Sequence, residues 1–203
     1  HRIGNSLATV SSLLALQVMR TQSDDVRAAL EAARLRVHAV ASAHRRLRLG
    51  DDLETARADE FLAAVLEDLA ETQTDGGRIA VHGELSPIEV SARDATTLGI
   101  LVGELVTNAL KYAFPDARSG TITVTLAPDD EDVPMLRVKD DGVGMREGDD
   151  ATESGLGSVI VKQLSGQFGG EPHYAPADGG GLEVRIRLPE LGRTRTTTKD
   201  DIL

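Results

Sequence analysis

The sequence predicts an α+β fold, in which an antiparallel helical hairpin (residues 1–50) precedes an α/β two-layer sandwich (residues 51–190). Two patterns predict this fold. Apolar residues recur every three or four positions through the first part of the chain, which is typical of helices packed along one face. Further along, helical segments of this kind are mixed with short segments in which apolar and polar residues alternate, as in strands. The remaining residues, 191–203, are polar and are expected to form a disordered tail.

The hairpin is predicted from two apolar stripes. The first stripe runs from Ile3 to Val18, and the second from Val26 to Leu47. The polar residues Ser23–Asp25 between them can form the turn and cap the second helix. Because a single hairpin cannot cover its own stripe, a second copy of the chain, the following domain or an upstream domain has to cover it.

Three helices are expected in the sandwich. The apolar spacing predicts a short helix around Phe61–Leu69 and a strongly apolar helix over Arg93–Ala113. The second of these is expected to stop at Phe114-Pro115, because the residue before a proline disfavours the helical conformation. A third helix is expected from Leu156 to about Phe168, where Gly169-Gly170 would end it.

Alternating segments predict five strands, at residues 78–82, 88–90, 121–126, 135–138 and 182–188. The acidic loop Asp129–Asp132 would join the third and fourth of them as a hairpin. The element order therefore predicts a sheet that is mostly antiparallel.

The composition excludes several classes of function. Hydrophobic residues make up 40% of the chain but aromatic residues only 2%, so the core has to be aliphatic. Cysteine is absent, which excludes disulfides and thiolate metal sites. The net charge of −11 argues against a nucleic-acid partner. Since no apolar run approaches the roughly 20 residues of a membrane span, a cytoplasmic protein is expected.

A polar face on the second sandwich helix is the first candidate for chemistry. Glu104, Asn108 and Lys111 are spaced by four and three residues and so share one helix face. Carboxylate and amide oxygens are ligands that Mg²⁺ prefers, and Mg²⁺ usually arrives with phosphates, which a lysine can neutralise. The alternative is an exposed polar face without a ligand.

Glycine-rich segments supply three further candidates. Asp140-Asp141-Gly142-Val143-Gly144 follows a strand, where a carboxylate can accept a hydrogen bond from an exocyclic amine such as that of adenine. Gly155-Leu156-Gly157 opens a helix, and the N–H groups of a helix N-terminus favour phosphate. Ordinary glycine turns are the alternative for both segments, and Gly179–Gly181 by itself indicates only a loop.

Taken in order, these segments resemble the N, G1 and G2 boxes of the GHKL ATPases (Bergerat fold) over Phe61–Pro189. The P-loop pattern is absent. The first residues, His1-Arg2-Ile3-Gly4-Asn5-Ser6-Leu7 and Ser11–Gln17, resemble the phosphoacceptor helix of the HisKA_2 sensor histidine kinases. The resemblance therefore implies the ATP-binding and phosphoacceptor region of a bacterial two-component sensor.

The resemblance implies roles for the ATP site, with ATP and Mg²⁺ as ligands. Asn108 would coordinate Mg²⁺ with Glu104 beside it, and Asp141 would bind the adenine amine. The remaining positions would line the phosphates, the lid or the adenine contact: Lys111, Tyr112, Gly142, Gly144, Gly155, Leu156 and Gly157.

For His1, the resemblance implies the phosphoacceptor, which would pass its phosphoryl group to an aspartate on a response-regulator receiver domain. Two departures stand out, since Arg2 replaces an acidic neighbour of the histidine and Leu182 replaces a threonine after the third glycine box. The chain begins at His1 without an initiator methionine, so a sensor domain is expected upstream of it. Both a homodimer through the hairpin and a monomer remain open.

Two other functions remain as alternatives. The chain could be another GHKL enzyme, such as an anti-sigma-type serine kinase, although that class usually lacks the helical hairpin. It could also be a non-catalytic phosphotransfer or scaffold protein, although the residues of the three boxes are intact.

Overall fold

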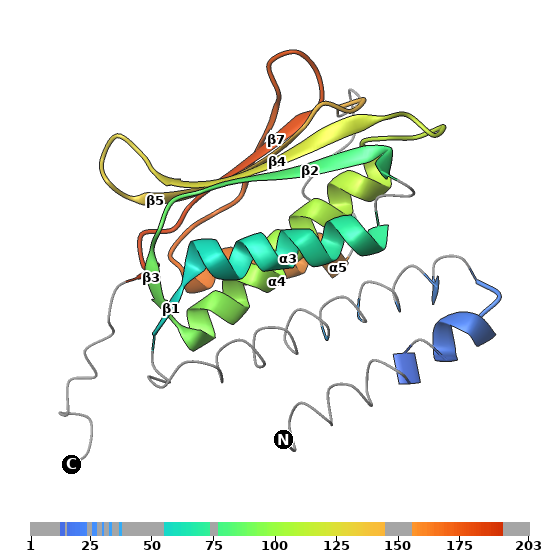
Figure 1. Cartoon of the computed structure of the whole chain (residues 1–203), viewed down its shortest axis with the longest axis horizontal. Coiled ribbons are helices and arrows are strands. Elements are labelled where there is room, and N and C mark those ends of the chain that lie inside the picture. Colours follow the sequence, from blue (N-terminus) through green and yellow to red (C-terminus); the bar gives the residue numbers. More distant parts are fainter. Residues whose placement is uncertain are drawn as a thin grey trace.

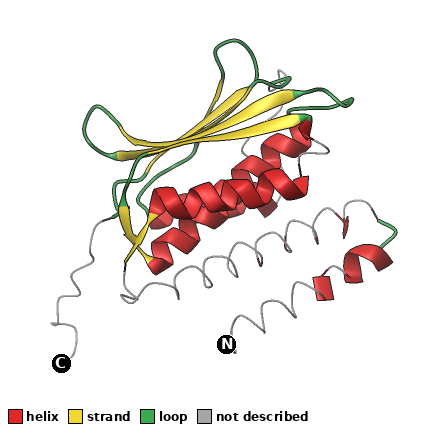
Figure 2. Cartoon of the chain, viewed as in Figure 1, coloured by secondary structure: helices red, strands yellow, loops and turns green. Residues whose placement is uncertain are grey.

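The computed structural model describes residues 13–14, 16–23, 26–27, 30, 33, 37, 55–73, 77–144 and 156–192. From residue 55 onward, these form two layers, a twisted sheet and a group of helices that covers one of its faces (Figures 1 and 2). The predicted α+β class is thereby confirmed.

The described part of the hairpin agrees with two helices and a turn between them. Residues 16–20 and 26–27 are helical, and residues 21–23 are not. Ser23 caps the second helix: its Oγ accepts the N–H of Val26 at 3.4 Å, and its carbonyl oxygen accepts that of Arg27 at 2.9 Å.

Three helices form one layer: α3 (Ala58–Gln73), α4 (Ala92–Tyr112) and α5 (Leu156–Gln167). All three were predicted from their apolar spacing. Helix α4 begins at a capping serine, since the Oγ of Ser91 accepts the N–H of Asp94 at 3.0 Å. It ends just before Phe114-Pro115, as predicted.

The five-stranded sheet has the order β2-β4-β5-β7-β6. Its strands are β2 (Ile79–Leu85), β4 (Gly120–Pro128), β5 (Pro134–Asp140), β6 (His173–Pro176) and β7 (Leu182–Arg187). Strands β2 and β4 run parallel because the chain crosses over through α4 between them, and the other pairs are antiparallel.

A second, two-stranded sheet pairs β1 (Thr55–Arg57) with β3 (Glu89–Ser91). The sequence did not predict β1 or β6, which have only three and four residues and so show little alternation.

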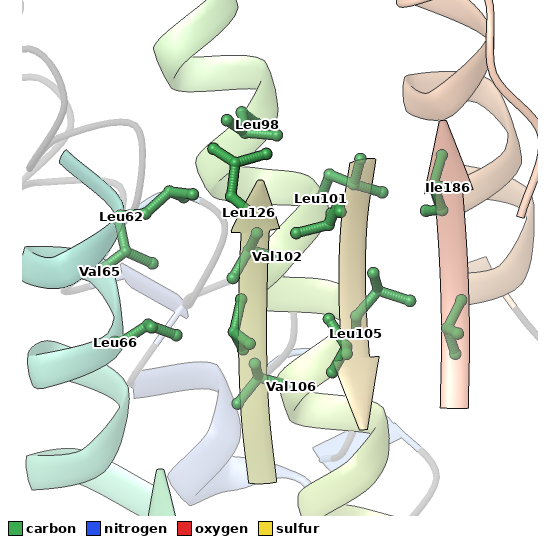
Figure 3. Close-up of a cluster of buried hydrophobic side chains, with 14 of the residues drawn as sticks. Leu62, Val65, Leu66, Leu98, Leu101, Val102, Leu105, Val106, Leu126 and Ile186 are labelled. Atoms are coloured by element: carbon green, nitrogen blue, oxygen red, sulfur yellow. The ribbon is translucent and has the colours of Figure 1, made fainter. Parts of the chain in front are cut away.

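The core lies between the helices and the main sheet and is aliphatic, as the composition predicted (Figure 3). Helix α4 supplies its central face, in which residues spaced by three and four are at most 4% exposed: Leu98, Leu101, Val102, Leu105 and Val106. Leu62 and Leu66 of α3 pack from one side, and Leu126 of β4 and Ile186 of β7 pack from the sheet. Helix α4 is therefore fixed on the sheet, and its polar residues have fixed positions.

Candidate active site

The last residue of β5, Asp140, holds a buried carboxylate. Asp140 as a whole residue is only 5% exposed. Its Oδ1 accepts two backbone N–H groups, from Gly142 at 2.9 Å and from Leu182 at 3.2 Å. Burial raises the pKa of Asp140, and these two hydrogen bonds oppose the increase only in part. Both bonds go to Oδ1, and among the described residues none goes to Oδ2.

Glycines let the backbone close tightly around Asp140. Gly181 has φ +90°, and a Cβ there would lie 2.0 Å from the carbonyl oxygen of Asp140. A Cβ at Gly142 would lie 2.2 Å from the carbonyl oxygen of Ala113, at the end of α4. The third glycine segment, which by sequence indicated only a loop, is thus part of the wall around Asp140.

The neighbouring Asp141 does not share the buried position of Asp140. It is exposed, and its Oδ1 accepts the N–H of Thr121 at 2.7 Å. The resemblance implies Asp141 for the adenine contact, but the buried position at the strand end belongs to Asp140. Strand alternation could have found it, because Leu136, Val138 and Asp140 share the buried face of β5. The Asp-x-Gly-x-Gly spacing also begins at Asp140.

The predicted polar face of α4 lies against the first turn of α5. Glu104 is 7% exposed and Asn108 is half-buried, so Glu104 is not part of an exposed polar face. A Cβ on Gly157 would lie 3.4 Å from Oε2 of Glu104 and 3.5 Å from Oδ1 of Asn108. The structure therefore brings together three predicted site residues from two helices.

Lys111 and Tyr112 extend the site along the last turn of α4. Both are exposed, Tyr112 to 71%. The loop after β5 is joined to this end of the helix, because the N–H of Val143 donates to the carbonyl oxygen of Ala113 at 2.9 Å. Gly144 lies nearby in the same loop, where a Cβ would be 3.1 Å from the carbonyl oxygen of Gly181.

Two predicted site residues, His1 and Gly155, lie outside the described residues, and Leu156 begins α5. Within the described part of the chain, no three histidine or acidic side chains gather to hold a metal ion. Among the helices that the structure describes, none has the length and hydropathy that a membrane span requires.

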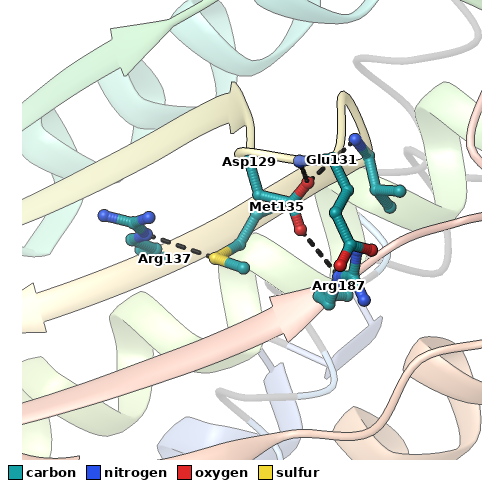
Figure 4. Close-up of polar contacts among 6 residues, drawn as sticks. Asp129, Glu131, Met135, Arg137 and Arg187 are labelled. Carbon is teal, nitrogen blue, oxygen red and sulfur yellow. Dashed lines mark hydrogen bonds and ion pairs between the residues drawn. The ribbon is translucent and has the colours of Figure 1, made fainter.

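A different polar cluster shapes the turn between β4 and β5, at the other end of β5 (Figure 4). Asp129 Oδ1 accepts the N–H groups of Glu131 at 2.9 Å and Val133 at 3.0 Å. The N–H of Val133 contributes most to lowering the pKa of Asp129. Arg187 of β7 pairs with both Asp129 and Glu131 at 2.7 Å.

Comparison with known families assigns both parts of the chain. Residues 1–73 match the histidine kinase family HisKA_2. Residues 93–192 match the HATPase_c family, described as histidine kinase-, DNA gyrase B- and HSP90-like ATPases. The chain belongs to the histidine kinase family. This membership agrees with the resemblance seen in the sequence.

Individual histidine kinases are similar over almost the whole chain. Blue-light-activated histidine kinase 2 of Erythrobacter litoralis (strain HTCC2594) is 30% identical over 99% of the chain, which spans 58% of that protein. Sensor histidine kinase PdtaS of Mycobacterium tuberculosis (strain H37Rv) is 32% identical over 95% of the chain, which spans 38% of that protein. The chain thus covers only part of these histidine kinases.

A solved histidine kinase has the same fold. The histidine kinase domain of the blue-light-activated kinase from Erythrobacter litoralis EL346 is 27% identical, with a TM-score of 0.65. The similarity covers 93% of this chain and 92% of that domain.

Proposed function

We propose that this chain transfers the γ-phosphoryl group of ATP to His1, from which it passes to an aspartate on the receiver domain of a response regulator. One observation carries the proposal: Gly157, in the first turn of α5, lies against the carboxylate of Glu104 and the amide of Asn108. A helix N-terminus favours phosphate, and hard oxygen ligands favour Mg²⁺. The arrangement therefore suits a magnesium-bound triphosphate.

Asn108, with Glu104 one helical turn before it, fits the metal part of this proposal. Both offer oxygen ligands on the same face of α4, next to the start of α5. Bound Mg²⁺ would neutralise charge on the phosphates, which is its main contribution to phosphoryl transfer. Lys111, exposed one turn further along α4, would add a positive charge on the same side.

Asp140, rather than Asp141, fits the adenine part. Its Oδ1 is held by two backbone N–H groups, and its Oδ2 can accept a hydrogen bond from the exocyclic amine. A carboxylate at a buried strand end is costly unless it has such a partner. Asp141, by contrast, is exposed, and its Oδ1 accepts the N–H of Thr121.

His1 as phosphoacceptor is supported by the HisKA_2 match over residues 1–73, which includes that residue. Phosphoryl transfer would break the bond between the γ-phosphorus and the β–γ bridging oxygen and form a bond to an imidazole nitrogen. A cytoplasmic location and an upstream sensor domain belong to the same proposal.

A homodimer is a further part of the proposal. Leu13, Leu16 and Met19 are 57%, 49% and 74% exposed, and a second copy of the hairpin could cover this apolar surface.

The test is incubation with γ-labelled ATP and Mg²⁺, followed by acid or alkali. We expect label that is lost in acid and kept in alkali, as phosphohistidine is, and no label in His1→Ala. Acid-stable label would instead indicate a serine kinase. Label on His1→Ala would contradict the assignment of the acceptor.

Asn108→Ala tests the metal site. We expect this variant to fold but to lose labelling of His1, because the Mg²⁺-bound phosphates would lose their protein ligand. The control is Asp130→Ala in the β4–β5 turn, which should label at the wild-type rate. Wild-type labelling by Asn108→Ala, with an unchanged melting temperature, would refute the role of Asn108.

A further inference from the structure

The backbone of Asp141 is fixed from several sides. Its N–H donates to the carbonyl oxygen of Thr121 at 3.3 Å, and its Oδ1 accepts the N–H of Thr121 at 2.7 Å. Nη2 of Arg118 donates to the carbonyl oxygen of Asp141 at 3.1 Å. The peptide that leads from Asp140 to Gly142 is thereby held against the start of β4.

The side chain of Asp141 occupies a space that residue 120 leaves open. A Cβ on Gly120 would lie 2.5 Å from Oδ1 of Asp141 and 2.1 Å from Cε1 of Phe114. Phe114 is buried, at 6% exposure, so its ring cannot move aside easily. Although Asp141 is an exposed residue, the position of its carboxylate is determined by its surroundings.

Asp140 depends on this peptide for one of its two hydrogen bonds. The N–H of Gly142, immediately after Asp141, donates to Oδ1 of Asp140 at 2.9 Å. A rotation of the backbone at residue 141 would turn this N–H away, and Oδ1 would keep only the N–H of Leu182.

We propose that Asp141 is a positioning residue for nucleotide binding, which acts through the backbone to fix the carboxylate of Asp140, with Arg118 as its helper. The proposal rests on the proposed function, in which Asp140 binds the adenine amine. In this proposal Asp141 does not contact the nucleotide. Arg118, in the loop between α4 and β4, contributes to adenine binding by holding the backbone of Asp141.

The charges around Asp140 agree with this arrangement. Burial has the largest effect in raising the pKa of Asp140, the adjacent Asp141 raises it further, and Arg118 lowers it. Arg118 therefore both holds the backbone of Asp141 and offsets part of its negative charge. Loss of Arg118 would remove both effects.

The test compares Asp141→Ala with Asp141→Asn by calorimetric titration of the full chain with Mg·ADP. The alanine variant loses the acceptor for the Thr121 N–H, so we expect Kd to rise about fivefold, which corresponds to about 1 kcal/mol. The asparagine variant keeps an acceptor oxygen, so its Kd should stay within about twofold of wild type. Asp130→Ala, which removes the same charge from a distant turn, should bind as wild type does.

Titration with a second ligand distinguishes a positioning role of Asp141 from a general structural role. The diphosphate of purine riboside lacks the 6-amino group, so its affinity should be the same for wild type and Asp141→Ala. Equal weakening for both ligands would overturn the proposal, as would wild-type affinity of Asp141→Ala for ADP. If Asp141→Ala does not fold, Arg118→Ala takes its place, with an expected increase in Kd of about twofold for ADP alone.

Asp140→Ala separates this inference from the proposed function. If that variant binds ADP as wild type does, the adenine role of Asp140 fails, whatever Asp141 does. If Asp141→Ala weakens binding more than Asp140→Ala, Asp141 touches the nucleotide itself and the positioning role is wrong.

Discussion

The two ends of strand β5 hold acidic side chains in different ways. Near its start, Asp129 and Glu131 are paired with the exposed side chain of Arg187. At its end, Asp140 is buried and held by backbone N–H groups between glycines. Exposed ion pairs shape a turn at little cost, whereas a buried carboxylate destabilises the fold unless a ligand or partner compensates. The difference favours the end of β5, and not its start, as the place of the proposed nucleotide site.

The largest expected effect is on nucleotide affinity at Asp140. Asp140→Ala should weaken Mg·ADP binding about a hundredfold, because a hydrogen bond to a charged group contributes about 3 kcal/mol at most. Asp129→Ala at the other end should leave Kd within about twofold of wild type. If calorimetry gives the same increase in Kd for both variants, the two ends of β5 do not differ in their role in nucleotide binding.

The next largest effect is on stability, at the glycines before β7. Gly181→Ala should lower the free energy of unfolding by about 3 kcal/mol, because its Cβ would overlap the carbonyl oxygen of Asp140. Gly179 is a matched control, since its φ of +89° is almost the same but nothing lies within 4 Å of its Cβ position. Gly179→Ala should cost about 1 kcal/mol. Urea unfolding of both variants measures the difference, and equal losses would mean that the wall around Asp140 is not tight.

The pH dependence of stability should differ in sign between the two ends. The pKa of Asp140 is raised by burial, so the folded state binds its proton more tightly than the unfolded state does, and ionisation destabilises the fold. The contribution of Asp140 to the free energy of unfolding should fall as the pH rises from the pKa of the unfolded state through the pKa of the folded state. Asp140→Asn should therefore gain stability relative to wild type over that range, and a constant difference would contradict it.

The smallest effect is expected at the start of β5. The pKa of Asp129 is lowered, chiefly by the N–H of Val133. Its carboxylate therefore stabilises the fold above the pKa of the unfolded state, and this stabilisation is lost as the pH falls through the pKa of the folded state. Arg187→Ala should change the melting temperature less than Gly179→Ala does, because the side chains of Arg187 and Glu131 are exposed, to 46% and 77%. A larger decrease would show that the ion pairs at the turn matter to the fold.

Most of the fold could be predicted from the sequence, because its long helices and strands have regular apolar patterns. Helix α4 and its polar residues Glu104 and Asn108 follow directly from spacing. The short strands β1 and β6 could not be predicted, since they exist through pairing with β3 and β7 rather than through their own patterns.

The candidate site was predicted less completely, for reasons that involve contacts distant in sequence. That Glu104 is buried follows from its position beneath α5, which the helix pattern alone does not reveal. The choice between Asp140 and Asp141 depends on the end of β5, where Asp140 lies on the buried face and Asp141 is exposed just beyond the strand. The role of Gly181 follows from the antiparallel pairing of β7 with β5.

The hydrogen bond from the N–H of Val143 to the carbonyl oxygen of Ala113 has a consequence for folding. The last carbonyl groups of a helix have no partner within it, and here one partner comes from a residue beyond two strands of the sheet. Contacts between residues far apart in sequence form late, because a long loop has to close first. We therefore expect the end of α4, with Lys111 and Tyr112, to stay frayed on a growing chain until β5 has joined the sheet. In the proposed function, nucleotide binding would then be limited to chains whose sheet has already formed.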